Sequence, residues 1–69
     1  MTDTDKLQGK MREKKLTLNA LASKVGLSPT GLFNKIHNDR EFTVSEMLAV
    51  SDCLALSSTE REQIFFASV

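Results

Sequence analysis

The chain has 69 residues, 41% of them hydrophobic, with a net charge of zero and one cysteine. A domain of this size buries only roughly 60% of the surface that its unfolded chain exposes, which leaves little room for a deep catalytic pocket. One cysteine excludes an internal disulfide bond and a zinc site made of four cysteines. No apolar run approaches the roughly 20 residues of a membrane span, and the first residues, MTDTDK, lack the basic start and apolar stretch of a signal peptide. We therefore expect one cytoplasmic domain over residues 1–69.

Charge is distributed unevenly along the chain. Residues 6–40 carry eight basic and two acidic side chains, a balance of +6, whereas residues 41–69 carry one basic and five acidic side chains, a balance of −4. A basic half and an acidic half indicate two different faces. The alternative is a chance asymmetry of solvated charges.

The first predicted element is an amphipathic helix over residues 4–14. Leu7 and Met11 stand one turn apart, and Asp3 or Thr4 can cap its first turn. A second helix of about eight residues follows Thr17 and ends at Gly26, a residue that readily adopts the left-handed conformation after a helix.

A third helix is expected to open at Ser28 and Pro29 and to run to about His37. The serine hydroxyl can accept a free backbone N–H, and proline loses nothing at the first helical position. Two further helices start at capping boxes, in which a hydroxyl residue is followed three places later by a glutamate. The boxes are Thr43 with Glu46, and Ser57 with Glu60. The sequence thus predicts an all-α domain of five helices and no strand.

Two short helices joined by a glycine-containing turn are typical of a helix-turn-helix unit, here about residues 17–37, which offers its second helix to the major groove of DNA. Ala22 stands where the two helices cross, and its small side chain lets the backbones approach. Gly26 permits the positive φ of the turn. The apolar residues expected in the buried seam are Leu21, Val25, Leu27, Leu32 and Ile36.

The stretches LTLNALASKVGLSPTGLFNKI and EFTVSEMLAVSDCLAL resemble the lambda-repressor-like, Xre/Cro-type helix-turn-helix regulators, especially the short forms of phages and prophages. The resemblance covers roughly residues 5–67. It implies a compact five-helix domain whose third helix reads bases, while the starts of helices 2 and 3 and the following loop hold phosphates. Two positions depart from the family pattern. Leu18 replaces a polar residue at the start of helix 2, and Lys35 stands where the last buried residue of helix 3 is usual, with Ile36 one place later.

The residues expected to read bases lie on the exposed side of the third helix: Pro29, Thr30, Phe33 and Asn34. Asn34 can pair with adenine, and Thr30 can meet a base edge or a thymine methyl. Phe33 either contacts thymine methyls or turns inward to meet Phe42. Gly31 either allows a close approach of the backbone or is merely tolerated in the helix.

Residues suited to phosphates surround this face, where contacts orient the protein without specifying sequence. Lys10 and Lys14 can reach the flanking DNA backbone. The principal candidates are Thr17, Asn19, Lys24, Ser28, Gly31, Lys35, His37 and Arg40.

The C-terminal residues Phe65, Phe66 and Val69 form a candidate dimer interface. Ile64 and one phenylalanine can complete the core of a domain this small, which leaves the other ring exposed with Val69. The alternative is that both rings pack within one monomer. A symmetric dimer would set two recognition helices about 34 Å apart and would read an inverted repeat.

Catalytic and metal-binding patterns are absent from the sequence. His37 is the only histidine and has no triad partners, Cys53 is expected to be a buried free thiol, and the acidic residues Glu41, Glu46 and Asp52 do not form a metal loop. We expect no enzyme activity, no cofactor and no metal.

These observations predict a sequence-specific DNA-binding transcriptional regulator, a Cro-like repressor that occupies an inverted-repeat operator in double-stranded DNA. It would act in the bacterial cytoplasm or nucleoid as a homodimer, at least on DNA, without a small-molecule effector. Two alternatives use the same fold. One is an antitoxin whose acidic half binds a toxin, and the other is a protein-interaction module such as an antirepressor or accessory subunit.

Overall fold

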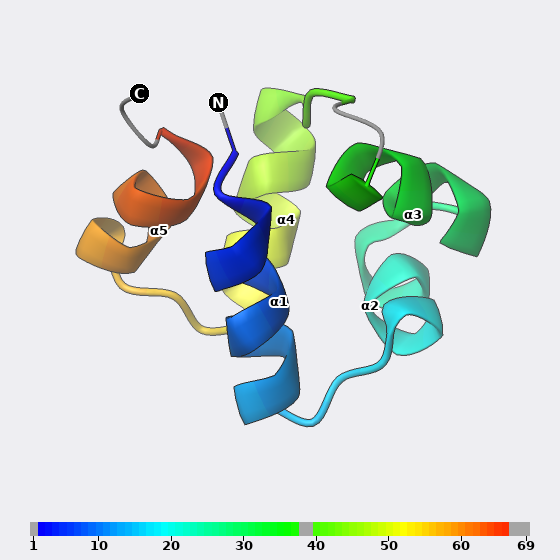
Figure 1. Ribbon diagram of the computed structural model, residues 1–69, viewed down its shortest axis with the longest axis horizontal. Coiled ribbons are helices and arrows are strands. Elements are labelled where there is room, and N and C mark those ends of the chain that lie inside the picture. Colours follow the sequence, from blue (N-terminus) through cyan, green and yellow to red (C-terminus); the bar gives the residue numbers. More distant parts are fainter. Residues whose placement is uncertain (1, 38–39, 67–69) are drawn as a thin grey trace.

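The computed structural model describes residues 2–37 and 40–66, and in those ranges it contains five α-helices and no strand. The prediction of an all-helical chain with five helices is therefore confirmed for the described residues. The helices are α1 (Thr4–Glu13), α2 (Leu18–Val25), α3 (Pro29–His37), α4 (Val44–Cys53) and α5 (Ser58–Phe65) (Figure 1).

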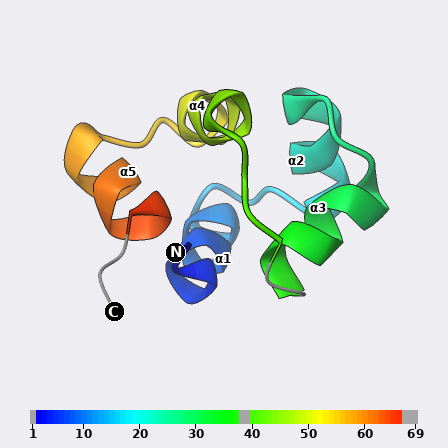
Figure 2. The same cartoon turned by 90° about the horizontal axis from the view of Figure 1, so that it is seen from above.

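Helices α1 and α4 lie one in front of the other in the middle of the molecule, with α5 on one side and the α2–α3 pair on the other (Figures 1 and 2). The backbone N–H of Asp3 donates to the carbonyl of Ile64 at 2.6 Å and joins the start of α1 to the end of α5. All five helices and the segment before α4 contribute to one core, formed by Leu7, Met11, Leu21, Ala22, Leu32, Ile36, Phe42, Val50, Leu54, Ile64 and Phe65.

Side-chain caps fix where the first two helices begin. The carboxylate of Asp3 accepts the N–H of Lys6 at 3.1 Å, so Asp3 rather than Thr4 caps α1. The hydroxyl of Thr17 accepts the N–H of Ala20 at 3.1 Å and caps α2. Each cap satisfies a backbone donor that the helix itself leaves free.

Both predicted capping boxes are present. The hydroxyl of Thr43 accepts the N–H of Glu46 at 3.2 Å, and the Glu46 carboxylate accepts the N–H of Thr43 at 2.8 Å. Ser57 and Glu60 repeat the arrangement at the start of α5, with distances of 3.1 and 2.9 Å. Reciprocal bonds of this kind define the first turns of α4 and α5.

Three helices are followed within two residues by a residue in the left-handed conformation: Lys15 (φ 56°), Gly26 (φ 78°) and Ala55 (φ 52°). Each is followed by a leucine whose N–H donates to a carbonyl five residues back at 2.9 Å and whose side chain packs against the core. These bonds satisfy carbonyls at the helix ends. Gly26 is the only one of the three that the sequence identifies. The leucines are Leu16, Leu27 and Leu56.

Candidate nucleic-acid interface

The α2–α3 pair is joined by a connection of three residues, Gly26 to Ser28. A Cβ on Gly26 would meet no heavy atom within 4 Å, so its φ of 78°, not crowding, explains the glycine. Ala22 is fully buried, as predicted for the residue between the two helices. Leu32 and Ile36 on α3 are buried as well, with 0% and 4% of their surface exposed, which leaves the opposite side of α3 to face outward.

A hydrogen bond fixes the first turn of α3. The Oγ atom of Ser28 accepts the N–H of Gly31 at 3.0 Å. A Cβ on residue 31 would lie 3.0 Å from the same oxygen, closer than nearly all Cβ contacts. A side chain at position 31 would therefore crowd the Ser28 hydroxyl that caps α3, which is a structural reason for glycine there. The hydroxyl hydrogen of Ser28 remains available to donate to an anion.

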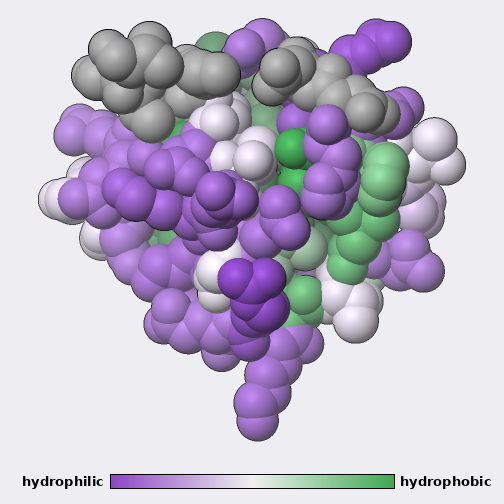
Figure 3. Space-filling view, viewed as in Figure 1, coloured by the Kyte–Doolittle hydropathy of each residue, from purple (hydrophilic) through white to green (hydrophobic). Residues whose placement is uncertain are grey.

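The outer side of α3 presents Pro29, Thr30, Phe33 and His37 as exposed residues. Phe33 exposes 46% of its surface, and its ring contacts the His37 ring with centroids 4.5 Å apart. The alternative in which Phe33 turns inward to Phe42 is wrong. Apolar surface gathers over α2 and α3, whereas the surface over α1 and α5 is mainly hydrophilic (Figure 3).

Asn34 occupies a different environment from the other predicted base readers. It is half-buried and lines a shallow hollow of about 180 Å³ together with Gly31, Lys35 and the exposed Arg40. The structure thus separates the four predicted base readers into exposed residues on the outer side of α3 and one amide in a hollow beside a cation.

Lys35 is half-buried and its ammonium group contacts other protein groups, whereas the sequence suggested a solvated cation. Its Nζ atom lies 3.1 Å from Oε1 of Glu46, donates to the carbonyl of Glu41 at 3.0 Å, and stands 5.8 Å from the centre of the Phe42 ring. The Lys35 side chain is 18% exposed. A phosphate contact by Lys35 would compete with these protein partners, which the sequence does not indicate.

The Glu46 carboxylate makes two contacts at once. Two contacts hold the pKa of Glu46 below its ordinary value of 4.5, although burial works against them. The larger effect comes from the N–H of Thr43 and the smaller from the ammonium group of Lys35. A carboxylate that caps α4 thus also binds a lysine on α3. The sequence identifies the capping role through the three-residue spacing, but it holds no signal for the pairing with Lys35.

The basic and acidic halves of the sequence are joined by ion pairs. Lys10 on α1 contacts Glu60 on α5 and lies 3.3 Å from Glu13. These contacts raise the pKa of Lys10, and the contact with Glu60 is the main cause. Lys10 thus joins α1 to α5, a contact that the sequence did not predict. Lys14 is exposed.

The remaining predicted phosphate ligands lie at the surface. Lys24 in the last turn of α2, Asn19 and Arg40 are exposed. Thr17 is exposed as well. Its hydroxyl oxygen accepts the N–H of Ala20, which leaves the hydroxyl hydrogen to donate to a phosphate. Ser28, directly before α3, and His37, its last residue, are exposed as well.

The two C-terminal rings differ in environment. Phe65 is 1% exposed and meets Phe42 edge to face at 5.5 Å, whereas Phe66 is 61% exposed. Phe65 is therefore removed from the predicted dimer interface, because its ring is part of the monomer core. Val69 lies outside the described residues.

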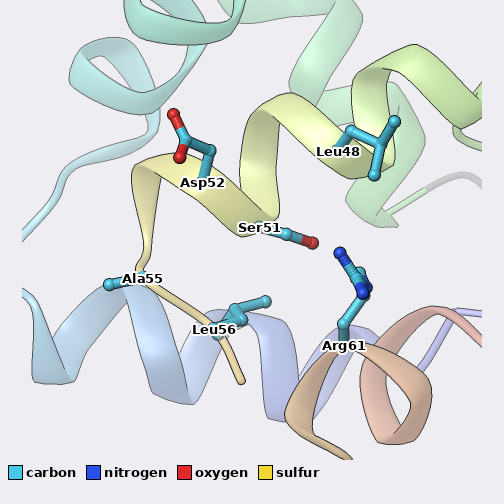
Figure 4. A pocket seen from close by; sticks show the side chains of 6 residues that line it. All are labelled: Leu48, Ser51, Asp52, Ala55, Leu56 and Arg61. Carbon is cyan, nitrogen blue, oxygen red and sulfur yellow. The ribbon is translucent and has the colours of Figure 1, made fainter. Parts of the chain in front are cut away.

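A second hollow lies between α4 and α5. This open groove of about 400 Å³ is lined by Leu48, Ser51, Asp52, Ala55, Leu56 and Arg61, and the Arg61 side chain extends from α5 toward Ser51 (Figure 4). Leu48 is 52% exposed, and Val44, one turn before it on α4, is 70% exposed. The sequence analysis assigned these two residues to a helix but did not predict that they face outward.

Other classes of site are not seen in residues 2–37 and 40–66. No helix there has the length and apolar character needed to cross a bilayer. That part of the chain also holds no group of three or more histidine, cysteine, aspartate or glutamate residues placed to bind a metal ion. Cys53 is a free thiol and is half-buried, less covered than the sequence predicted.

Comparison with protein-family models, with curated proteins and with solved structures gives no match to this chain.

Proposed function

We propose that this protein is a sequence-specific DNA-binding transcriptional regulator, with α2 and α3 as the helix-turn-helix unit of a lambda-repressor-like domain. The observation that carries the proposal is the outer side of α3. A nine-residue helix, fixed at its start by Ser28 and by burial of Leu32 and Ile36, exposes Thr30, Phe33 and His37 together.

The exposed groups on α3 have chemistry suited to base edges in a major groove. The Thr30 hydroxyl can donate or accept, and the Phe33 ring can cover thymine methyl groups. Asn34 can form a bidentate pair with adenine N6 and N7, a contact that discriminates by roughly 1–3 kcal/mol. These three residues are the proposed readers of sequence.

Exposed cations and hydroxyl donors around α3 are suited to the DNA backbone. Lys24 and Arg40 carry full charges, and Ser28 and Thr17 stand at the starts of α3 and α2, where free N–H groups favour anions. In this proposal they set the register of α3 on the duplex without reading bases.

Regulation would follow from occupancy of an operator that excludes RNA polymerase. We propose a homodimer on an inverted repeat, in the manner of a Cro-like phage or prophage repressor in the bacterial cytoplasm. Among the residues assigned to its interface, Phe66 supports this part of the proposal, because its ring is 61% exposed.

Selection of binding sites from a random duplex library, followed by salt titration on the enriched sequence, tests the proposal. The expected result is an inverted repeat with half-sites about one helical turn apart. Weak binding without enrichment, with a steep dependence on salt, would contradict it.

Two variants separate base reading from backbone contact on the selected site. Asn34→Ala should relax the preference at one base pair. Lys24→Ala should weaken binding to all duplexes alike and reduce the salt slope by about one unit. Equal losses on specific and random DNA for Asn34→Ala would remove Asn34 from the readers.

A second candidate function is a protein-interaction module, either an antitoxin or an accessory subunit. It is favoured by the groove between α4 and α5, beside which Val44 and Leu48 expose apolar surface in the acidic half of the chain. Loss of a co-purifying protein partner in Leu48→Glu, with a folded monomer retained, is the result expected for this function.

A further inference from the structure

Lys35 and Glu46 connect the end of α3 to the start of α4. The Nζ–Oε1 distance is 3.1 Å, and both side chains are 18% exposed. Glu46 is fixed in turn by the N–H of Thr43 at 2.8 Å, so the carboxylate that receives Lys35 is part of a rigid helix start.

The same ammonium group also reaches the segment between the two helices. It donates to the Glu41 carbonyl at 3.0 Å and lies over the ring of Phe42, which is buried against Phe65. Three parts of the chain therefore meet at one nitrogen: the last turn of α3, the segment before α4 and the first turn of α4. Lys35 is also the only lysine or arginine in α3.

We infer that Lys35 and Glu46 are positioning residues, which set the orientation of α3 and thereby aim Phe33 and Asn34 at the bases. The inference rests on the proposed DNA-reading function. Lys35 directly follows Asn34 on α3, so a movement of Lys35 away from α4 displaces the reading side chains as well. A half-buried ion pair resists such movement, because breaking it leaves a charge without its partner in a poorly hydrated position.

This role gives Glu46 an effect on binding opposite to that of an ordinary surface acid. A carboxylate near DNA normally repels phosphates, and its neutralisation raises affinity. Glu46→Gln should instead lower affinity for the selected operator by about five- to twentyfold, since Lys35 loses its partner. Gln can still accept the N–H of Thr43, so the capping box is retained.

Matched variants distinguish positioning from phosphate contact. Glu41→Gln removes the same charge nearby but leaves the carbonyl that Lys35 uses, and it should raise affinity by up to about threefold. Lys35→Met should lower operator affinity as Glu46→Gln does, without changing the salt slope. Lys35→Arg should restore binding, because a guanidinium can pair with Glu46. The double variant Lys35→Met with Glu46→Gln should lose no more than either single variant.

The inference is overturned if Glu46→Gln raises affinity as Glu41→Gln does, or if Lys35→Met reduces the salt slope by about one unit. A measurement without DNA keeps it separate from the proposed function. Amide hydrogen exchange in α3 should accelerate in Glu46→Gln and Lys35→Met but not in Glu41→Gln. If the wild-type protein selects no DNA sequence, the proposed function fails, and exchange in α3 alone decides whether the Lys35–Glu46 contact orients that helix.

Discussion

The rings of Phe33 and His37 stand one turn apart on α3, with centroids 4.5 Å apart and planes tilted by 42°. A pair of this spacing stabilises an isolated helix by only roughly 0.2–0.5 kcal/mol. Because Phe33 is also 46% exposed, the pair contributes little to the core. The ring is therefore free to contact DNA in the proposed complex without loss of core packing.

Phe33→Ala should therefore weaken operator binding while leaving the protein nearly as stable. Covering the exposed half of a phenylalanine ring contributes about 1 kcal/mol, which is about fivefold in affinity. The free energy of unfolding should change by less than about 1 kcal/mol. Fluorescence anisotropy on the selected duplex and urea unfolding measure the two effects.

Leu48→Ala provides the control, because Leu48 is similarly exposed but lies on α4 beside the α4–α5 groove. It should leave DNA affinity unchanged. A destabilisation of Phe33→Ala as large as that of a core truncation, about 3 kcal/mol or more, would place the ring in the core and contradict this interpretation.

Features that depend on neighbouring residues in the chain could be predicted from the sequence. The two capping boxes, the cap at Thr17 and the turn at Gly26 each involve residues within a few positions of one another. The Lys35–Glu46 contact joins residues on different helices, so spacing along the chain could not indicate it. For this reason the sequence predicts Lys35 as a phosphate ligand and does not indicate its contact with Glu46.

Acid should destabilise the protein through Glu60. Two contacts lower the pKa of Glu60 from 4.5 to about 2. The larger effect comes from Lys10 and the smaller from the N–H of Ser57. Since the folded-state pKa lies below the unfolded one, the stabilisation is complete above pH 4.5 and is lost as pH falls toward 2. The midpoint of thermal unfolding should fall across this range.

Glu60→Gln isolates this contribution, because glutamine can retain the capping box but has no charge for Lys10. The variant should be less stable than the wild type at pH 7 and should lose less stability between pH 5 and pH 2. The contact also raises the pKa of Lys10, so its benefit persists below pH 10.5 and declines at higher pH. Parallel pH profiles for variant and wild type would contradict the assignment.

Ala55→Gly should stabilise the protein. Ala55, two residues after α4, adopts a φ of 52°, where a side chain costs about 1–2 kcal/mol and glycine costs little. The greater freedom of glycine in the unfolded chain offsets part of the gain, which leaves about 0.5–1 kcal/mol. Urea unfolding should show a higher midpoint with an unchanged slope.

Ala49→Gly makes the same exchange within α4 and should destabilise by about 1 kcal/mol. The positive φ at Ala55 and at Lys15 was not predictable from local preference, because neither residue type favours this conformation. In both cases the following leucine packs against the core, which is consistent with tertiary packing rather than local preference setting the backbone there. If both exchanges destabilised the protein equally, strain at Ala55 would be excluded.

Phe66→Ser should weaken self-association if the protein forms the proposed dimer through its C-terminal end. The sequence predicted that one of the two rings is exposed but not which one. The structure identifies Phe66, with 61% of its surface exposed. In a symmetric dimer each ring is covered once, so loss of about 1 kcal/mol per copy weakens dimerisation by about thirtyfold.

Sedimentation equilibrium, with and without the operator duplex, measures this change. Leu48→Ser is the matched control variant, because Leu48 lies on the α4–α5 groove. Weakening by Leu48→Ser alone would move the interface to that groove, and a wild-type protein that stays monomeric on DNA would contradict the dimer.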